Sequence, residues 1–193
     1  GHTMYVAGGI ENPTSTTTSH GFWSLDVSDE KATWQELKSW PGRERMLAVS
    51  GCDGAAFYLF GGAALHADAE GKPEREWLRD AYRYSPAKGW EKLPDMPRVV
   101  VAAPSPAPLL KTGQLLVMTG DDGSKVSFKP ETQHPGFPRT AMTFDPKTHQ
   151  WQSAGEVPFS RATVPVTEWQ GTFIIPNGEA RPGYRTPEVW QMR

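Results

Sequence analysis

The chain has 193 residues, a formal net charge of −2 and one cysteine, Cys52. This length allows one or two ordinary domains, and a single cysteine excludes an internal disulfide. The near-neutral charge gives no electrostatic reason to expect nucleic acid or an anionic membrane as a partner. No apolar run approaches the roughly 18–20 residues of a membrane-spanning helix, because the longest runs, 57–60 and 172–175, have the length of a strand.

Short hydrophobic strands that end at glycine recur along the chain. The strand at 4–7 precedes Gly8-Gly9, the strand at 57–60 precedes Gly61-Gly62, and two degraded copies precede Thr119-Gly120 and Asn177-Gly178. The second glycines, at positions 9, 62, 120 and 178, lie 53, 58 and 58 residues apart. A fixed period of this size indicates an internal structural repeat.

A second signal runs in phase with the first. Aromatic strands are predicted at 22–26, 81–86 and 141–146, and they are followed by Trp34, Trp90 and Trp151 respectively. A fourth copy begins at 188–192. Glycine, aromatic strand and tryptophan at a period near 50 are typical of kelch repeats. Because one such unit cannot bury both faces of its small sheet, we expect the three tryptophans to be buried between neighbouring blades.

These signals predict an all-β fold, a kelch-type β-propeller of about three and a half four-stranded blades. The expected blades are 1–45 (incomplete), 46–98, 99–161 and 162–193 (incomplete), with 46–95 and 99–158 each supplying four strands. The chain opens close to a predicted strand at Tyr5, so we expect a fragment boundary there. Propellers close with about 4–8 blades; we expect a six-bladed ring, with the missing blades supplied by the same full-length chain.

The connections between the second and third strands of each blade should gather on one face, the usual place for a ligand. These connections are long and polar, at 10–21, 63–79, 121–140 and 179–187. An arginine also recurs where one blade passes to the next, as Arg45, Arg98 and Arg161. These arginines either bind a substrate carboxylate or pair with a carboxylate of the adjacent blade, and the sequence leaves both roles open.

The segment 177–186 places a carboxylate, Glu179, six residues before Arg185 on a loop constrained by glycine and proline. Such a loop can hold an acid/base group and an anion-binding group in a fixed relation. The segment resembles the corresponding loop of the kelch-type N-acetylneuraminate epimerases, the sialic acid mutarotases. The resemblance implies that Glu179 is the proton acceptor and that Arg185 holds the sugar carboxylate. It also implies a small-molecule sugar substrate and a periplasmic or secreted location.

Anomer exchange needs one proton removed and one delivered, which a single carboxyl group and water can supply. No metal or other cofactor is expected, since the five histidines are scattered without metal-ligand spacing. The sequence therefore favours a carbohydrate mutarotase or epimerase. The alternative is a non-catalytic propeller that binds a glycan or a protein. A copper radical oxidase is disfavoured, because Cys52 reads as a small core residue at the end of a strand.

Overall fold

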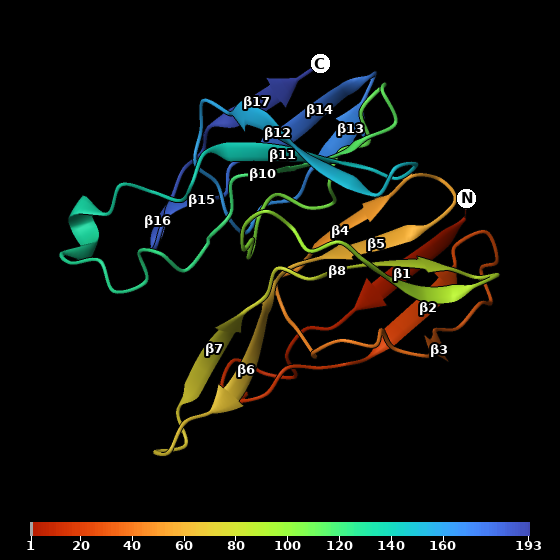
Figure 1. Cartoon of the computed structure of the whole chain (residues 1–193), viewed down its shortest axis with the longest axis horizontal. Helices are drawn as coiled ribbons and strands as arrows, with labels where there is room; N and C mark the ends of the chain where they lie inside the picture. Colours follow the sequence, from red (N-terminus) through yellow and green to blue (C-terminus); the bar gives the residue numbers. More distant parts are fainter. Residues whose placement is uncertain (1) are drawn as a thin grey trace.

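The computed structural model describes residues 2–193, and almost all of its regular structure is antiparallel β-sheet (Figure 1). Four sheets follow one another along the chain. The first contains β1 (Thr3–Ala7), β2 (Phe22–Asp26) and β3 (Gln35–Leu37), and the second contains β4 (Val49–Cys52), β5 (Phe57–Phe60), β8 (Ala81–Ser85) and β9 (Gly89–Leu93). The third contains β10 (Leu115–Met118), β11 (Thr140–Asp145) and β12 (Gln150–Glu156), and the fourth contains β13 (Thr167–Trp169), β14 (Thr172–Pro176) and β17 (Val189–Met192).

Two further hairpins are inserted into these sheets. The hairpin β6 (Ala63–Ala67) and β7 (Pro73–Trp77) lies between β5 and β8 in sequence, and β15 (Glu179–Arg181) and β16 (Tyr184–Arg185) lie between β14 and β17. A short 3-10 turn, η1 (Glu131–Gln133), lies in the segment between β10 and β11. Within residues 2–193, no helix has the length and apolar character that a membrane crossing requires.

The sheets pack face to face, and β5 shows how the sequence achieves this. Its four residues, Phe57, Tyr58, Leu59 and Phe60, are all buried. Because side chains alternate across a strand, Phe57 and Leu59 join the core shared with the first sheet, whereas Tyr58 and Phe60 join the core shared with the third. A separate cluster that includes Met118 joins the third and fourth sheets. This stacking of small antiparallel sheets confirms the all-β propeller fold.

The innermost segments of neighbouring sheets are joined directly through the backbone. Ala102 N donates to Leu47 O at 2.8 Å, and Thr163 N donates to Ala102 O at 2.7 Å. These three residues share positive φ values of 56°, 55° and 53°. At both junctions between these three blades, a residue in this conformation donates a hydrogen bond to its counterpart in the preceding blade, a feature that the side-chain pattern did not predict.

The third sheet lacks the regular innermost strand that we expected within 99–158. That segment forms only isolated bridges, including Leu109 with Leu115 and a parallel bridge from Gly51 to Ala107. Pro104, Pro106 and Pro108 occupy alternate positions there. Each proline removes a backbone donor from a ladder, so the segment keeps its place beside the neighbouring sheets without forming a continuous strand.

Two expectations about burial are wrong. Cys52, expected in the core, is exposed at the end of β4. Trp34, expected between blades, is 46% exposed. Its counterparts are held by the preceding sheet, since Trp90 Nε1 donates to Lys38 O at 2.8 Å and Trp151 Nε1 donates to Pro94 O at 2.9 Å. Within residues 2–193 no sheet precedes the first one, so Trp34 has no such surface against which to pack.

Candidate functional site

The segments inserted between the second and third strands of the blades project from the same side of the molecule. In Figure 1 the hairpins β6–β7 and β15–β16 and the segment that carries η1 all extend toward the left of the view. Regions expected to be polar loops at 63–79 and 179–187 thus contain hairpins.

The hairpin β15–β16 is fixed to the body of the protein at its first residue. Glu179 N donates to Ala162 O at 2.9 Å, and Ala162 N donates to Glu179 O at 2.8 Å. Gly178 precedes it with a φ of 95°, and a Cβ there would come within 2.9 Å of the Val164 Cβ. Glycine is therefore needed both for the backbone conformation and for the close approach. The backbone of Glu179 is thus held by the first segment of its own blade.

Glu179 and Arg185 are directly opposite each other in this hairpin. Glu179 is half-buried and Arg185 is exposed. The Glu179 Oε1 atom accepts a hydrogen bond of 2.6 Å from Gly183 N, which lies in the turn of the same hairpin. No ion pair joins this carboxylate to Arg185 or Arg181 among the residues described. The carboxylate is consequently oriented by its own turn, through one of its two oxygens.

The side chain of Arg45 makes all its contacts inside the protein. It is fully buried and forms an ion pair with Asp80, with distances of 2.7 Å and 2.8 Å for the two N–O contacts. Gly61 O and Arg43 O accept the remaining hydrogen bonds. The five N–H groups of an arginine are thereby all used. The sequence left open whether Arg45 binds a substrate or pairs with a carboxylate of the adjacent blade, and these contacts support the pairing.

The ionisation of Asp80 and Tyr82 depends on burial and on the contacts made at this corner. Burial favours a higher pKa for Asp80, but the hydrogen bonds and charge of Arg45, with a hydrogen bond from Tyr82, outweigh it and lower the pKa. Burial, and then the hydrogen bond to Asp80, raise the pKa of Tyr82 to about 12. The junction therefore holds a charged carboxylate and a neutral phenol at neutral pH.

Arg98 lies two residues before Val100, which holds the position equivalent to Arg45 and Arg161, and no carboxylate contacts the Arg98 side chain among the residues described. Its guanidinium donates to the backbone oxygens of Val99, Thr119 and Thr140. Its Nε is buried without a partner in the described structure. Burial lowers the pKa of Arg98, partly offset by the negative charge of Asp122. Of the three corner arginines, Arg98 is thus the one whose charge is not neutralised by direct contact with a carboxylate.

Arg161 lies at the third corner, 2% exposed, and its side chain reaches a carboxylate of the fourth sheet. The NH2 group donates to Glu188 Oε2 at 2.6 Å, and NH1 donates to Ser160 O at 2.7 Å. A cleft of 440 Å³ opens beside this pair. The structure thus separates the candidates: Glu179 and Arg185 share a hairpin, whereas Arg45, Arg98 and Arg161 are held at three successive corners.

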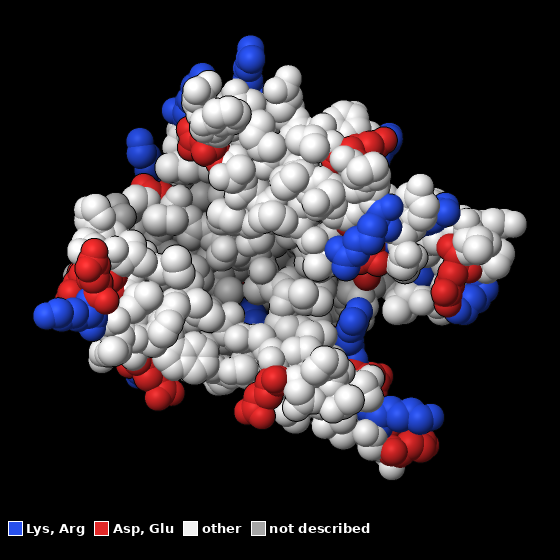
Figure 2. All heavy atoms as spheres, turned by 180° about the vertical axis from the view of Figure 1, so that it is seen from behind, with Lys and Arg blue, Asp and Glu red and all other residues white. Residues whose placement is uncertain are grey.

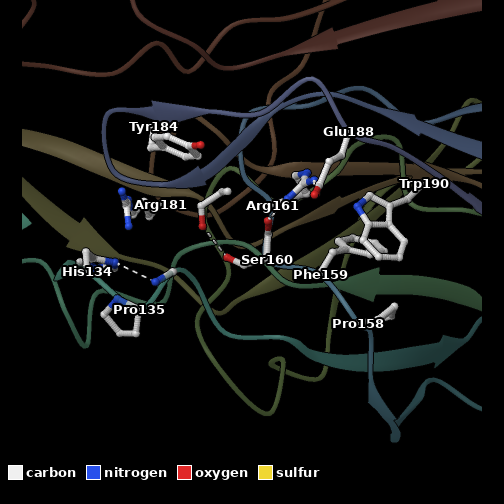
Figure 3. A pocket seen from close by; sticks show the side chains of 12 residues that line it. His134, Pro135, Pro158, Phe159, Ser160, Arg161, Arg181, Tyr184, Glu188 and Trp190 are labelled. Carbon is white, nitrogen blue, oxygen red and sulfur yellow. Dashed lines mark hydrogen bonds and ion pairs between the residues drawn. The ribbon is translucent and has the colours of Figure 1, made fainter. Parts of the chain in front are cut away.

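The cleft beside Arg161 is bounded by two groups of side chains. Figure 3 shows Phe159 and Trp190 together on one side, and His134, Arg181 and Tyr184 on the other. Arg181 lies over the Tyr184 ring, 4.7 Å from its centroid. Arg181 and Tyr184 come from the same hairpin as Glu179 and Arg185, so the cleft adjoins the proposed catalytic loop. Sequence reasoning did not identify Phe159 or Trp190 because each fits the repeat as an ordinary core residue.

The charges on the face shown in Figure 2 are of both signs and lie mainly toward the rim, around a hollow with largely uncharged walls. Among residues 2–193, no group of three or more His, Cys, Asp and Glu side chains is placed to hold a metal ion.

Comparison with known proteins identifies relatives of this arrangement. The chain is 30% identical over 193 residues to an N-acetylneuraminate epimerase of Haemophilus influenzae (strain 86-028NP), covering 88% of this chain and 50% of that protein. It is 28% identical over 201 residues to an N-acetylneuraminate epimerase of Yersinia enterocolitica, covering 91% of this chain and 50% of that protein. The chain thus spans about half the length of the curated relatives it matches.

The fold comparison agrees with the sequence comparison. The solved structure of YjhT superposes with a TM-score of 0.73 at 24% sequence identity, covering 96% of this chain and 61% of that one. No protein-family model matches the chain. The chain has the fold of a kelch-type β-propeller and resembles the N-acetylneuraminate epimerases along most of its length.

Proposed function

We propose that the protein containing this chain is a sugar mutarotase that interconverts the anomers of a sialic acid or a related acidic sugar. In this proposal Glu179 is the general base and Arg185 holds the substrate carboxylate. Further blades of the same polypeptide complete the ring, since the curated relatives are about twice as long as the aligned region. Because those relatives are named N-acetylneuraminate epimerases, N-acetylneuraminate is the first substrate to examine.

The observation that carries the proposal is the direct pairing of Glu179 with Arg185 across the hairpin β15–β16. Directly opposed residues of an antiparallel pair have Cβ atoms about 4.5–5.5 Å apart and share one face. A sugar whose carboxylate and anomeric hydroxyl are attached to the same carbon fits such a pair. The arginine would hold the carboxylate bidentately while the glutamate reaches the neighbouring hydroxyl.

The reaction requires the protein to supply only a proton acceptor and a proton donor. Glu179 removes the proton of the anomeric hydroxyl, the bond between the anomeric carbon and the ring oxygen breaks, and the ring oxygen takes a proton from water or from the protonated Glu179. Rotation of the resulting open-chain carbonyl and reclosure by the reverse steps give the other anomer. A positioned general base contributes about 10²–10⁴-fold to such a rate. The 2.6 Å hydrogen bond from Gly183 N supports a fixed orientation of this carboxylate.

The three corner arginines have different places in this proposal. Arg98, without a contacting carboxylate, remains a candidate for substrate binding, and Arg161 borders the cleft beside the hairpin. Arg45 has every donor engaged within the protein, which supports a structural function for it.

The deciding experiment follows anomer exchange of N-acetylneuraminate by proton NMR, with the full-length protein. We expect Glu179→Gln to lower the rate about 10²–10⁴-fold and Arg185→Ala to weaken substrate binding. Glu168→Gln, an exposed carboxylate on β13 of the fourth sheet, is the matched control and should retain full activity.

Two results would contradict the proposal. Full activity of Glu179→Gln would remove the base from this residue. Failure of the full-length protein to accelerate exchange of any acidic or neutral sugar would favour the second candidate, a non-catalytic propeller that binds a glycan or a protein partner. That candidate is compatible with the aromatic and cationic cleft at Phe159, Arg181 and Trp190.

A further inference from the structure

The corners that contain Arg45 and Arg161 have equivalent backbone structures, but their hydrogen-bond donors are used differently. Gly61 N donates to Asp80 O, and Asn177 N makes the matching bond to Glu188 O. The strand registers then place Trp190 at the position of Tyr82. The set formed by Arg161, Glu188 and Trp190 therefore corresponds to Arg45, Asp80 and Tyr82. A comparison of the two sets shows what is distinctive about the second one.

In the first set every donor is used and the space is filled. The five hydrogen bonds of Arg45 have been described, and Tyr82 Oη donates to Asp80 Oδ2 at 2.8 Å. Trp40 is 1% exposed and lies with its ring centroid 5.5 Å from the guanidinium carbon of Arg45. Its own Nε1 donates to Arg43 O at 2.7 Å. This corner is complete without a ligand.

In the second set two buried nitrogen atoms are left without a partner. Arg161 uses NH1 and NH2, but its Nε is buried and makes no hydrogen bond in the described structure. The Nε1 of Trp190 is also buried without a partner. Both residues line the 440 Å³ cleft, and in Figure 3 the Trp190 indole nitrogen faces the side on which Arg161 and Glu188 lie. Because buried donors in native proteins are normally satisfied, this end of the cleft fits an oxygen that accepts.

The walls of the cleft limit what that oxygen belongs to. The rings of Phe159 and Trp190 lie 5.1 Å apart at 33° and form an apolar surface next to the donors. Glu188 already supplies a negative charge to Arg161, so a second carboxylate at this point would be repelled. A neutral carbonyl oxygen with a small apolar substituent matches both features. An N-acyl group of an amino sugar has this composition.

We propose that this cleft is the subsite for the acylamino group of an N-acylated sugar. The amide carbonyl accepts from Arg161 Nε and Trp190 Nε1, and the acyl methyl packs against the rings of Phe159 and Trp190. The inference rests on the proposed function, because Arg181 and Tyr184, on the hairpin of Glu179, form the opposite wall. It extends that function by naming the residues that select an N-acylated substrate.

The test observes the Trp190 indole N–H directly. The full-length protein is labelled with ¹⁵N, and the Trp190 indole resonance is assigned by its loss in Trp190→Phe. N-acetylneuraminate and the analogue with a hydroxyl in place of the acetamido group are then titrated. We expect the first sugar to shift the Trp190 resonance and the second to leave it in place. Because each of the two proposed hydrogen bonds contributes about 0.5–1.5 kcal/mol, the analogue should bind about 5- to 150-fold more weakly.

Trp190→Phe keeps an aromatic wall and removes the donor. In this variant we expect a reduced preference for N-acetylneuraminate, because Arg161 Nε is then the one donor left to the carbonyl, while Trp169→Phe, a 68% exposed tryptophan in the same sheet, retains the full preference. The wild-type resonance gives an answer even if Trp190→Phe does not fold. An unshifted Trp190 resonance at saturation, or equal affinity of wild type for both sugars, would overturn the subsite.

The two proposals fail separately. Accelerated anomer exchange with no shift of Trp190 would remove the subsite and leave the mutarotase. A Trp190 shift specific to the N-acetyl sugar without accelerated exchange would remove the mutarotase and leave an N-acylated-sugar site on a binding protein. A shift with acetate and none with acetamide would overturn the assignment of a neutral carbonyl.

Discussion

Arg45 and Asp80 form a two-point ion pair across the junction of the first and second sheets, with N–O distances of 2.7 Å and 2.8 Å. The arginine comes from the segment that enters the second sheet, and the aspartate directly precedes β8. The pair therefore fixes the segment before β4 to the connection between β5 and β8. This contact explains the arginine at this corner without requiring a ligand.

Arg45→Ala should lower the free energy of unfolding by about 3–5 kcal/mol, because it leaves the largely buried Asp80 carboxylate without its cation. Urea denaturation of the full-length protein measures the change. Arg139→Ala is the matched control, since its pair with Glu156 is long, at 3.5 Å, and both side chains are more than half exposed. Exposed pairs contribute about 0–1 kcal/mol, so an equal loss in both variants would contradict the importance of the Arg45 pair.

Asp80 should make stability depend on pH. Its pKa is lower in the folded protein than the ordinary value of 3.8, so the unfolded chain takes up the proton first as the pH falls. The stabilisation is fully present above the ordinary pKa and is lost as the pH falls through the folded value. Between pH 6 and pH 3, the free energy of unfolding should therefore fall more steeply in wild type than in Asp80→Asn. Parallel curves for the two proteins would contradict this account.

Gly62 should tolerate alanine poorly, and a second glycine provides the comparison. Gly62 has a φ of 92°, and a Cβ there would lie 2.6 Å from Met46 O and 3.0 Å from Ala48 Cα. Gly54 has a φ of 89° with open space around the added carbon. Both substitutions incur backbone strain of about 1–2 kcal/mol, but Gly62→Ala adds a clash. Thermal denaturation should show a clearly larger loss for Gly62→Ala, and equal losses would mean that the innermost segment moves freely.

The sequence predicted the sheets because their signals are local. The four strands that end near glycine, and the aromatic strands after them, follow from alternation and turn chemistry. The hairpin β6–β7 was missed since Pro73–Trp77 is almost wholly exposed and carries three charged residues, so it shows no apolar alternation. The missing innermost strand of the third sheet could have been read from Pro104, Pro106 and Pro108.

The site was less accessible to sequence reasoning. The spacing of Glu179 and Arg185 suggested a shared loop, but their direct register depends on the two-stranded turn around Gly183. The difference between Arg45 and Arg161 was not predictable either. It depends on whether Trp40 fills the corner and on which carboxylate each guanidinium meets. Such differences arise between segments far apart in the sequence and have no periodic signal.

Gly183 should be needed to position Glu179. Its N–H donates to Glu179 Oε1 at 2.6 Å, and its φ of 70° disfavours a residue with a Cβ, although space around it is open. In Gly183→Ala the turn should relax toward negative φ and move this donor, lowering kcat for anomer exchange about tenfold. Gly171→Ala, with a φ of 71° and equally open space, should lose similar stability and keep kcat. Gly183→Asn should recover activity, because asparagine tolerates positive φ. If Gly183→Ala and Gly171→Ala have the same kcat, the hydrogen bond from Gly183 does not position the base.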